Sequence, residues 1–165
     1  MTKQLPIYIF LLLSIGAKSQ LTIPDILEKF NNKTVEYITV DEAINGDDFI
    51  FLDAREREEF EVSHLKNAVW VGYDDFEIDR VSQIAPDKKI PIVVYCSVGV
   101  RSEDVGEKLK LAGYTQIRNL YGGIFEWKNQ GNPVYNTQNQ PTDNVHPFSK
   151  YWGQLLTNAD KVYNK

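Results

Sequence analysis

The sequence predicts an α/β fold: a five-stranded, mainly parallel sheet with helices on both faces, followed by a short C-terminal helical tail. Three observations indicate this fold. Apolar runs of strand length alternate five times with helical segments, which is typical of a parallel sheet with crossover helices. Two of the runs, residues 49–52 and 91–95, are almost wholly apolar, as expected of strands buried on both faces. The 165 residues are enough for one domain with a hydrophobic core.

The predicted elements follow one another along the chain. Apolar runs predict strands at residues 35–38, 49–52, 68–71, 91–95 and 117–120. Helical spacing of apolar side chains predicts helices at residues 23–30, 76–84 and 102–112. Shorter helices are expected at residues 41–44, 56–61 and 124–129. The strand at 91–95 is the most apolar and is expected to be central, and Gly113 is expected to end the helix at 102–112.

The composition changes after the last of these helices. Residues 135–145 are polar and rich in Asn and Gln, so a loop is expected there. Phe148, Trp152, Leu155 and Leu156 then recur at helical spacing, which predicts a C-terminal helix. We expect this helix to pack on the core of its own domain; a surface for a partner is the alternative.

The start of the chain has the pattern of a secretory signal peptide. An apolar stretch at residues 5–17 follows a basic residue, and the small residues Ala17 and Ser19 precede an expected cut between Ser19 and Gln20. The stretch is short for a membrane anchor, because spanning a bilayer takes about 20 residues. We therefore expect that cleavage of the signal peptide removes residues 1–19 and leaves a periplasmic or secreted protein without a stable membrane anchor.

The expected organisation has four parts: a signal peptide, a helical lead-in, the α/β domain, and a polar connector with a C-terminal helix. They occupy residues 1–19, 20–34, 35–134 and 135–165. Removal of residues 1–19 takes away Lys3 and Lys18 but no acidic residue, so the net charge changes from −5 to −7. This acidic balance argues against nucleic acid and anionic membranes as partners. The few histidines, His64 and His146, offer no metal cluster.

Cys96 is the only cysteine, so the chain can form no internal disulfide, which is unusual for an exported domain. It follows the strand at 91–95, and in parallel sheets ligands bind beyond the carboxyl ends of the strands. A thiol that faces the amide end of the next helix is in a place that favours its thiolate form. The alternative is an inert buried cysteine that acts as a small hydrophobe.

The loop after the cysteine contains groups that suit an anion. Ser97, Val98, Gly99 and Val100 can turn backbone N–H groups toward the sulfur, and Gly99 can adopt a positive φ. Arg101 adds a permanent cation. We expect this cradle to hold a thiolate or a persulfide, which carries an outer anionic sulfur.

Two segments resemble the single-domain rhodanese family of thiosulfate sulfurtransferases. The first reads LDAREREEF at residues 52–60 with SHLKNA at 63–68. The second begins with YCSVGVRS at residues 95–102 and continues with the later matches Leu109, Ala112-Gly113-Tyr114, Asn119-Leu120, Gly122-Gly123-Ile124 and Trp127. The resemblance covers roughly residues 35–134.

The resemblance implies a rhodanese-like fold and a covalent sulfur relay. Cys96 matches the catalytic nucleophile, which takes sulfane sulfur from a small donor such as thiosulfate and passes it to cyanide or a thiol. Ser97, Val98, Gly99, Val100 and Arg101 match the substrate-binding loop. The family needs no metal and no organic cofactor, and a thiol protein is a further candidate partner.

The match also has departures and neighbours with structural roles. Ser63 and Asn67 stand where the family has glycines, and Asn tolerates left-handed geometry better than Ser. The loop has one cation, which makes thiosulfate less suited as the natural donor. Asp53 and Arg55 are expected to brace adjacent loops, and His64 is expected to be a structural turn residue.

Two other functions remain open from the sequence. Cysteine phosphatases place five residues between cysteine and arginine, whereas four residues separate Cys96 from Arg101, which leaves a smaller loop. A non-catalytic binding or redox-sensing module in the periplasm is the second alternative, because domains of this fold also serve as interaction or sensing parts.

Overall fold

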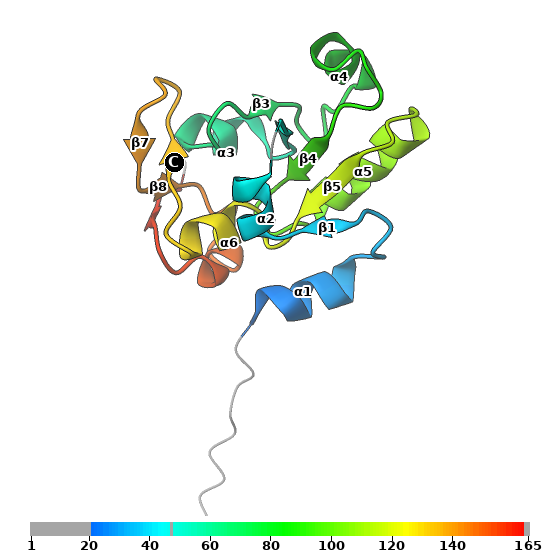
Figure 1. Cartoon of the computed structure of the whole chain (residues 1–165). Helices are drawn as coiled ribbons and strands as arrows, with labels where there is room; N and C mark the ends of the chain where they lie inside the picture. Colours follow the sequence, from blue (N-terminus) through cyan, green and yellow to red (C-terminus); the bar gives the residue numbers. More distant parts are fainter. Residues whose placement is uncertain (1–20, 47, 164–165) are drawn as a thin grey trace, which may run out of the picture.

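A computed structural model describes residues 21–46 and 48–163, so the predicted signal peptide lies outside the described residues. The centre is a five-stranded sheet in the order β1-β5-β4-β2-β3, and all its neighbouring strands are parallel (Figure 1). The strands are β1 (Tyr37–Ile38), β2 (Ile50–Asp53), β3 (Val69–Trp70), β4 (Ile92–Tyr95) and β5 (Ile117–Leu120). The predicted five-stranded parallel sheet is therefore confirmed, with β4 central and fully buried.

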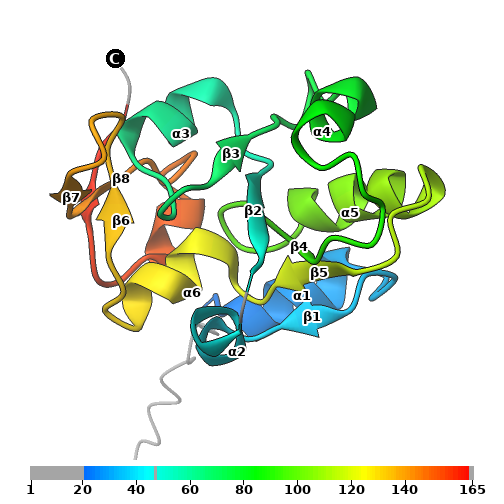
Figure 2. The same ribbon diagram turned by 45° about the horizontal axis from the view of Figure 1, so that its top comes forward.

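Six helices accompany the sheet in the described part of the chain: α1 (Ile23–Phe30), α2 (Val40–Asn45), α3 (Arg57–Val62), α4 (Ile78–Ile84), α5 (Arg101–Leu111) and α6 (Gly123–Asn129). The alternation along β4 divides the core into two clusters. Val93 and Tyr95 contribute to the cluster formed with α1, α2 and α6, whereas Ile92 and Val94 contribute to the cluster formed with α4 and α5. Helices thus cover both faces, as Figure 2 shows.

Local sequence explains where several helices begin and end. Thr22 accepts a hydrogen bond from the Asp25 N–H at the start of α1. Thr39 and Glu42 form a capping box at the start of α2. Gly113 follows α5 with φ +93°, a conformation that glycine adopts without a steric penalty, as predicted.

The first strand is shorter than the sequence predicts. Of the expected strand at residues 35–38, only Tyr37 and Ile38 pair with β5. Val35 is buried against α5, where an added Cβ on Gly106 would lie 2.9 Å from Val35 Cγ2. Packing of α5 close to Val35, rather than strand pairing, explains the apolar residue at this position.

The region after α6 differs from the predicted loop. Short strands β6 (Val134–Tyr135) and β7 (Pro141–Thr142) pair antiparallel, and β8 (Asn144–Val145) pairs in parallel with β9 (Asp160–Lys161). The expected loop at 135–145 is therefore wrong in part. The polar composition is explained by the turn inside the hairpin, where Asn136 Oδ1 accepts hydrogen bonds from the backbone of Gln138 and Gln140.

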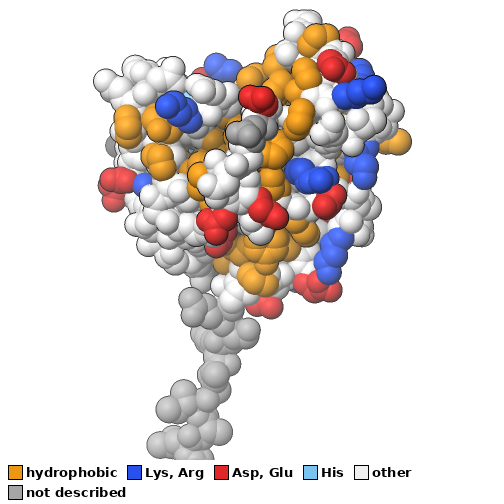
Figure 3. Space-filling view, viewed as in Figure 1, with side chains coloured by type: hydrophobic (Ala, Val, Ile, Leu, Met, Phe, Trp, Pro, Cys, Tyr) orange, Lys and Arg blue, Asp and Glu red, His pale blue; other side chains and the backbone are white. Residues whose placement is uncertain are grey.

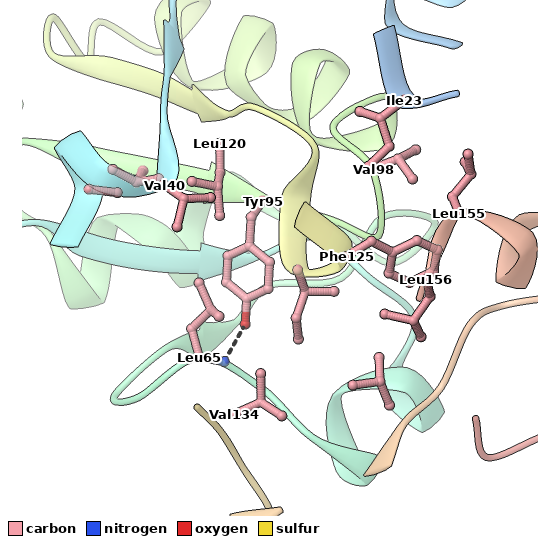
Figure 4. Close-up of a cluster of buried hydrophobic side chains, with 14 of the residues drawn as sticks. Ile23, Val40, Leu65, Tyr95, Val98, Leu120, Phe125, Val134, Leu155 and Leu156 are labelled. Atoms are coloured by element: carbon pink, nitrogen blue, oxygen red, sulfur yellow. Dashed lines mark hydrogen bonds between the residues drawn. The ribbon is translucent and has the colours of Figure 1, made fainter. Parts of the chain in front are cut away.

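The tail contains one helical turn, not the α-helix that the spacing predicts. A 3-10 helix, η1 (Trp152–Leu155), is followed by extended backbone at Leu156. The segment runs from β8 to β9, and Phe148 near its start has φ +63°, which lies outside the α-helical region and interrupts the predicted helix. Leu155 and Leu156 nevertheless pack on the core beside Phe125, as expected for a tail that docks on its own domain (Figure 4).

The surface combines both charges with exposed apolar groups. Figure 3 shows apolar side chains in a band across one face of the molecule, with acidic and basic side chains interspersed around it. Within residues 21–46 and 48–163, no helix has both the length and the apolar character needed to cross a membrane.

Candidate active site

Cys96 directly follows the central strand β4 and is 1% exposed. The Gly99 N–H donates a hydrogen bond to Cys96 Sγ at 3.1 Å. Ser102 Oγ lies 3.5 Å from the same sulfur and donates to Asn119 Oδ1 at 2.7 Å. The sulfur thus lies between one backbone donor and one hydroxyl group, at the amino-terminal end of α5 (Arg101–Leu111). The sequence predicts several backbone donors around the sulfur. Among the described residues, the Gly99 N–H is the backbone group that donates to it.

The loop after Cys96 has its shape fixed from two sides. Gly99 has φ +105°, and an added Cβ would lie 3.3 Å from the Leu120 carbonyl oxygen, so this position favours glycine. The Gly99 carbonyl accepts hydrogen bonds from the side-chain amides of Asn31 and Asn119, each at 2.8 Å. No sequence motif indicates the role of Asn31, which comes from the lead-in, whereas Asn119 belongs to one of the segments that resemble the family.

The start of α6 packs directly against the backbone of the same loop. The Ile124 N–H donates to the Cys96 carbonyl at 2.9 Å, and the Phe125 N–H donates to the Ser97 carbonyl at 3.1 Å. Gly123 has φ +54°, and an added Cβ there would lie 2.2 Å from the Cys96 carbonyl oxygen. The glycines at the start of α6, Gly122 as its N-cap and Gly123 as its first residue, therefore allow the helix to approach the site closely.

Arg101 is bound by a buried carboxylate. Its Nη1 donates to Glu59 Oε2 at 2.7 Å, and its Nη2 donates to Glu59 Oε1 at 2.9 Å. Ser97 Oγ also donates to Glu59 Oε1, at 2.9 Å. Burial would raise the pKa of Glu59, but the hydrogen bonds and charge of Arg101 outweigh it and hold the pKa below its usual value. Glu59 lies in the first matched segment, but nothing in the sequence around it indicates that it binds Arg101.

This ion pair changes what the loop can offer to a ligand. A second carboxylate, Glu56, lies 3.6 Å from Arg101 Nη1. The one cation of the loop is therefore balanced inside the protein, and it supplies much less attraction to a dianion than a free guanidinium would. Arg101 lines the cavity beside Cys96, but both of its terminal nitrogens are engaged by Glu59.

A cavity of about 210 Å³ opens beside the cysteine. The residues that line it are Cys96, Ser97, Val98, Val100, Arg101, Phe148 and Trp152. The structure thus brings together the predicted site residues except Gly99, which supports the loop from behind. Phe148 and Trp152 come from the tail, about which the sequence indicated only core packing or a partner surface.

Neighbouring residues brace the site. Asp53 and Arg55 are fully buried and form a salt bridge, with Arg55 Nη2 2.6 Å from Asp53 Oδ2. His64 Nδ1 lies 2.9 Å from the Leu65 carbonyl, and its ring stacks on Phe60 at 4.3 Å. These contacts agree with the structural roles expected of the three residues.

The two departures from the family's glycines also find an explanation. Asn67 has φ +59°, the left-handed geometry that Asn tolerates, whereas Ser63 is in extended backbone with φ −167°.

Among residues 21–46 and 48–163, no group of three or more His, Cys, Asp or Glu side chains is arranged to hold a metal ion.

Comparisons with known proteins agree with this architecture. The tRNA uridine(34) hydroxylase of Photorhabdus laumondii is 33% identical over 113 residues, which are 62% of this chain and 32% of that protein. The protein of the same name from Hamiltonella defensa is 35% identical over 91 residues, 53% of this chain and 26% of that protein. The chain therefore spans about a third or less of the length of these curated relatives.

Two solved structures show the same fold. A thiosulfate sulfurtransferase from Pseudomonas aeruginosa superposes with a TM-score of 0.58 at 20% identity, over 70% of this chain and 22% of that chain. A rhodanese-related protein from Thermoplasma volcanium superposes with a TM-score of 0.51 at 26% identity, over 60% of this chain and 96% of that chain. The model of the family described as "Rhodanese-like domain" matches residues 37–130, and the chain belongs to this family.

Proposed function

We propose that the protein is a sulfurtransferase in which Cys96 carries sulfane sulfur as a persulfide. The observation that carries the proposal is the position of Cys96: it lines a cavity, and the Gly99 N–H donates a hydrogen bond to its sulfur. The amide hydrogen bond and the nearby start of α5 place positive partial charge beside the sulfur, and the thiolate is the form of cysteine that attacks.

The reaction proceeds in two displacements. After its proton has passed to solvent, the Cys96 thiolate attacks the outer sulfur of the donor. A bond forms between Sγ and that sulfur, the donor's sulfur–sulfur bond breaks, and the leaving group departs with its electron pair. With thiosulfate the leaving group is sulfite. A nucleophile such as cyanide or a thiol then attacks the outer sulfur, and the Cys96 thiolate is regenerated.

The protein supplies a fixed loop for these steps. Hydrogen bonds from Asn31 and Asn119 and the contact with α6 hold the backbone around Cys96. A preorganised site spends no energy on reordering during the reaction. We propose that Ser97, Val98, Val100 and Arg101 contact the donor, because they line the cavity beside the sulfur.

The proposed partners are small sulfur compounds or a thiol protein, in the periplasm or outside the cell. The location rests on the signal-peptide pattern of residues 1–19. The curated relatives are named for an activity on tRNA, but the net charge of −5 gives little support to an RNA partner for this chain. We favour sulfur transfer over phosphatase chemistry, since four residues separate Cys96 from Arg101.

The test is thiocyanate formation from thiosulfate, or another sulfane donor, and cyanide. We expect turnover by the wild-type protein and none above background by Cys96→Ser, because the hydroxyl cannot carry the sulfur. The folding of both proteins is compared by urea unfolding. Equal turnover by Cys96→Ser would contradict the proposal. Absence of turnover with every donor, from folded wild-type protein with a reduced thiol, would favour a binding or redox-sensing module instead.

A further inference from the structure

The segment at residues 146–152, here called the strap, contributes Phe148 and Trp152 to the lining of the cavity and is fixed at both ends. Before it, β8 is joined to β9 by hydrogen bonds from the Asp160 N–H to the Asp143 carbonyl at 2.8 Å and from the Val162 N–H to the Val145 carbonyl at 3.0 Å. After it, the Leu155 carbonyl accepts a hydrogen bond from the Asn129 side chain at 2.8 Å. The strap is therefore held beside the site, although its sequence lies outside the matched family region.

Two aromatic rings of the strap form one wall of the cavity. Phe148 and Trp152 line it together with the loop that contains Cys96. Trp152 also contacts Phe30 of α1, with ring centroids 6.4 Å apart. The Phe148 ring lies 4.9 Å from Arg101 Cζ, in range of a cation–π contact.

The backbone at Phe148 is strained, and the ring is not well buried. Phe148 has φ +63°, which is uncommon for a bulky residue and costs free energy. The Phe148 N–H donates to His146 Nδ1 at 3.2 Å, which supports this conformation. The side chain remains 50% exposed, so burial in the core does not explain the strain. Such strain is found where a side chain is held for a function.

The charge of the cavity points to a particular kind of ligand. Arg101 is balanced by Glu59 and by Glu56, so the field for a dianion is weak. Val98, Val100 and the two strap rings present apolar surface instead. A donor that carries an apolar group gains free energy by burying that group here.

Resting on the proposed sulfur transfer, we propose that Phe148 and Trp152 determine the donor, and that they select donors whose leaving group carries a flat apolar substituent. Benzenethiosulfonate is a suitable probe. The Cys96 thiolate attacks its outer sulfur, the sulfur–sulfur bond breaks, and benzenesulfinate leaves with the electron pair. Cyanide then takes the outer sulfur as thiocyanate. Methanethiosulfonate reacts in the same way and has the same charge, but it lacks the ring.

The experiment compares kcat/KM for these two donors with cyanide as the acceptor. In the wild-type protein we expect the ratio of benzenethiosulfonate to methanethiosulfonate to exceed the ratio of their uncatalysed reactions by about tenfold. Phe148→Ala should lower the ratio by about tenfold. Phe148→Asn should do the same while retaining a residue that tolerates positive φ. Lys150→Ala is the control, since Lys150 is exposed on the strap and does not line the cavity, and it should leave the ratio unchanged because the two donors carry the same charge.

The outcomes separate the two proposals. A ratio that is the same in the wild type and in both Phe148 variants, with sulfur transfer intact, would overturn the role of the strap and leave sulfur transfer standing. Failure of both donors to react with folded wild-type protein would overturn sulfur transfer itself. A loss of the ratio in Phe148→Asn with unchanged urea unfolding would support donor selection by the ring.

Discussion

Asp53→Ala is expected to lower the free energy of unfolding by about 3–5 kcal/mol, because it leaves the Arg55 guanidinium buried without its counter-ion. Both side chains are fully buried. Arg55 Nε donates to Asp53 Oδ1 at 2.9 Å, and Arg55 Nη2 also donates to the Ser63 carbonyl at 2.6 Å. Burial would lower the pKa of Arg55, but the charge and hydrogen bonds of Asp53 outweigh it and raise the pKa above its usual value. Arginine is so basic that it keeps its proton in proteins, so the charge stays when Asp53 is removed.

The loss is a large part of the total, since domains of this size are stable by about 5–15 kcal/mol. Urea unfolding at neutral pH measures it. The control is Glu61→Ala, which removes the exposed pair between Arg57 and Glu61 and should cost about 0.5 kcal/mol or less. The double variant with Asp53→Ala and Arg55→Met should regain part of the loss, because no buried charge remains. Equal effects of Asp53→Ala and Glu61→Ala would contradict this account.

Glu59→Gln is expected to change both stability and the response to thiosulfate. The amide keeps the shape of the carboxylate but removes the charge that binds Arg101 through two hydrogen bonds. We expect the free energy of unfolding to fall by about 2–3 kcal/mol at neutral pH. The Arg101 charge, less fully balanced, should attract the thiosulfate dianion better and lower its KM by about fivefold.

The stability effect should depend on pH in a defined direction. Because the folded-state pKa of Glu59 lies below the usual value of 4.5, its carboxylate contributes stability above that value and loses it as the pH falls through the folded-state pKa. The difference between wild type and Glu59→Gln should therefore be largest near neutral pH and shrink below about pH 4. Glu58→Gln is the control, since it makes the same charge change at an exposed position of the same helix. A difference that grows in acid, or an unchanged thiosulfate KM, would contradict the role of Glu59.

The sheet and the position of Cys96 could be predicted because both depend on local sequence. A continuous apolar run such as β4 can be recognised without its neighbours, and the carboxyl end of a central parallel strand is a place where ligands bind. The residue types at Gly99, Gly113 and Asn67 likewise indicated a positive φ, a backbone geometry that few residues adopt, and all three have it.

The partners of the site residues could not be predicted in the same way. Arg101 and Glu59 are 42 positions apart, and nothing in the loop itself shows that its cation is balanced. Asn31 reaches Gly99 across 68 positions. Such pairings depend on how the elements pack, and a single sequence contains no direct signal for them.

The tail shows how one pattern can have two structural causes. Phe148, Trp152, Leu155 and Leu156 fit a helical period, yet only one 3-10 turn forms. The two leucines are buried in the core, whereas the two aromatic residues line the cavity beside Cys96. Apolar spacing records that these side chains meet apolar surfaces, but it does not distinguish a core from the wall of a cavity.

Whether Cys96 carries sulfane sulfur as a persulfide can be measured directly from the intact mass of the protein after incubation with a sulfane donor and removal of excess reagent. We expect wild-type protein to gain the mass of one sulfur atom and Cys96→Ser to gain none, and we expect cyanide to remove the added mass and yield thiocyanate. Folded wild-type protein with a reduced Cys96 that gains no sulfur from thiosulfate, methanethiosulfonate or benzenethiosulfonate would contradict this expectation.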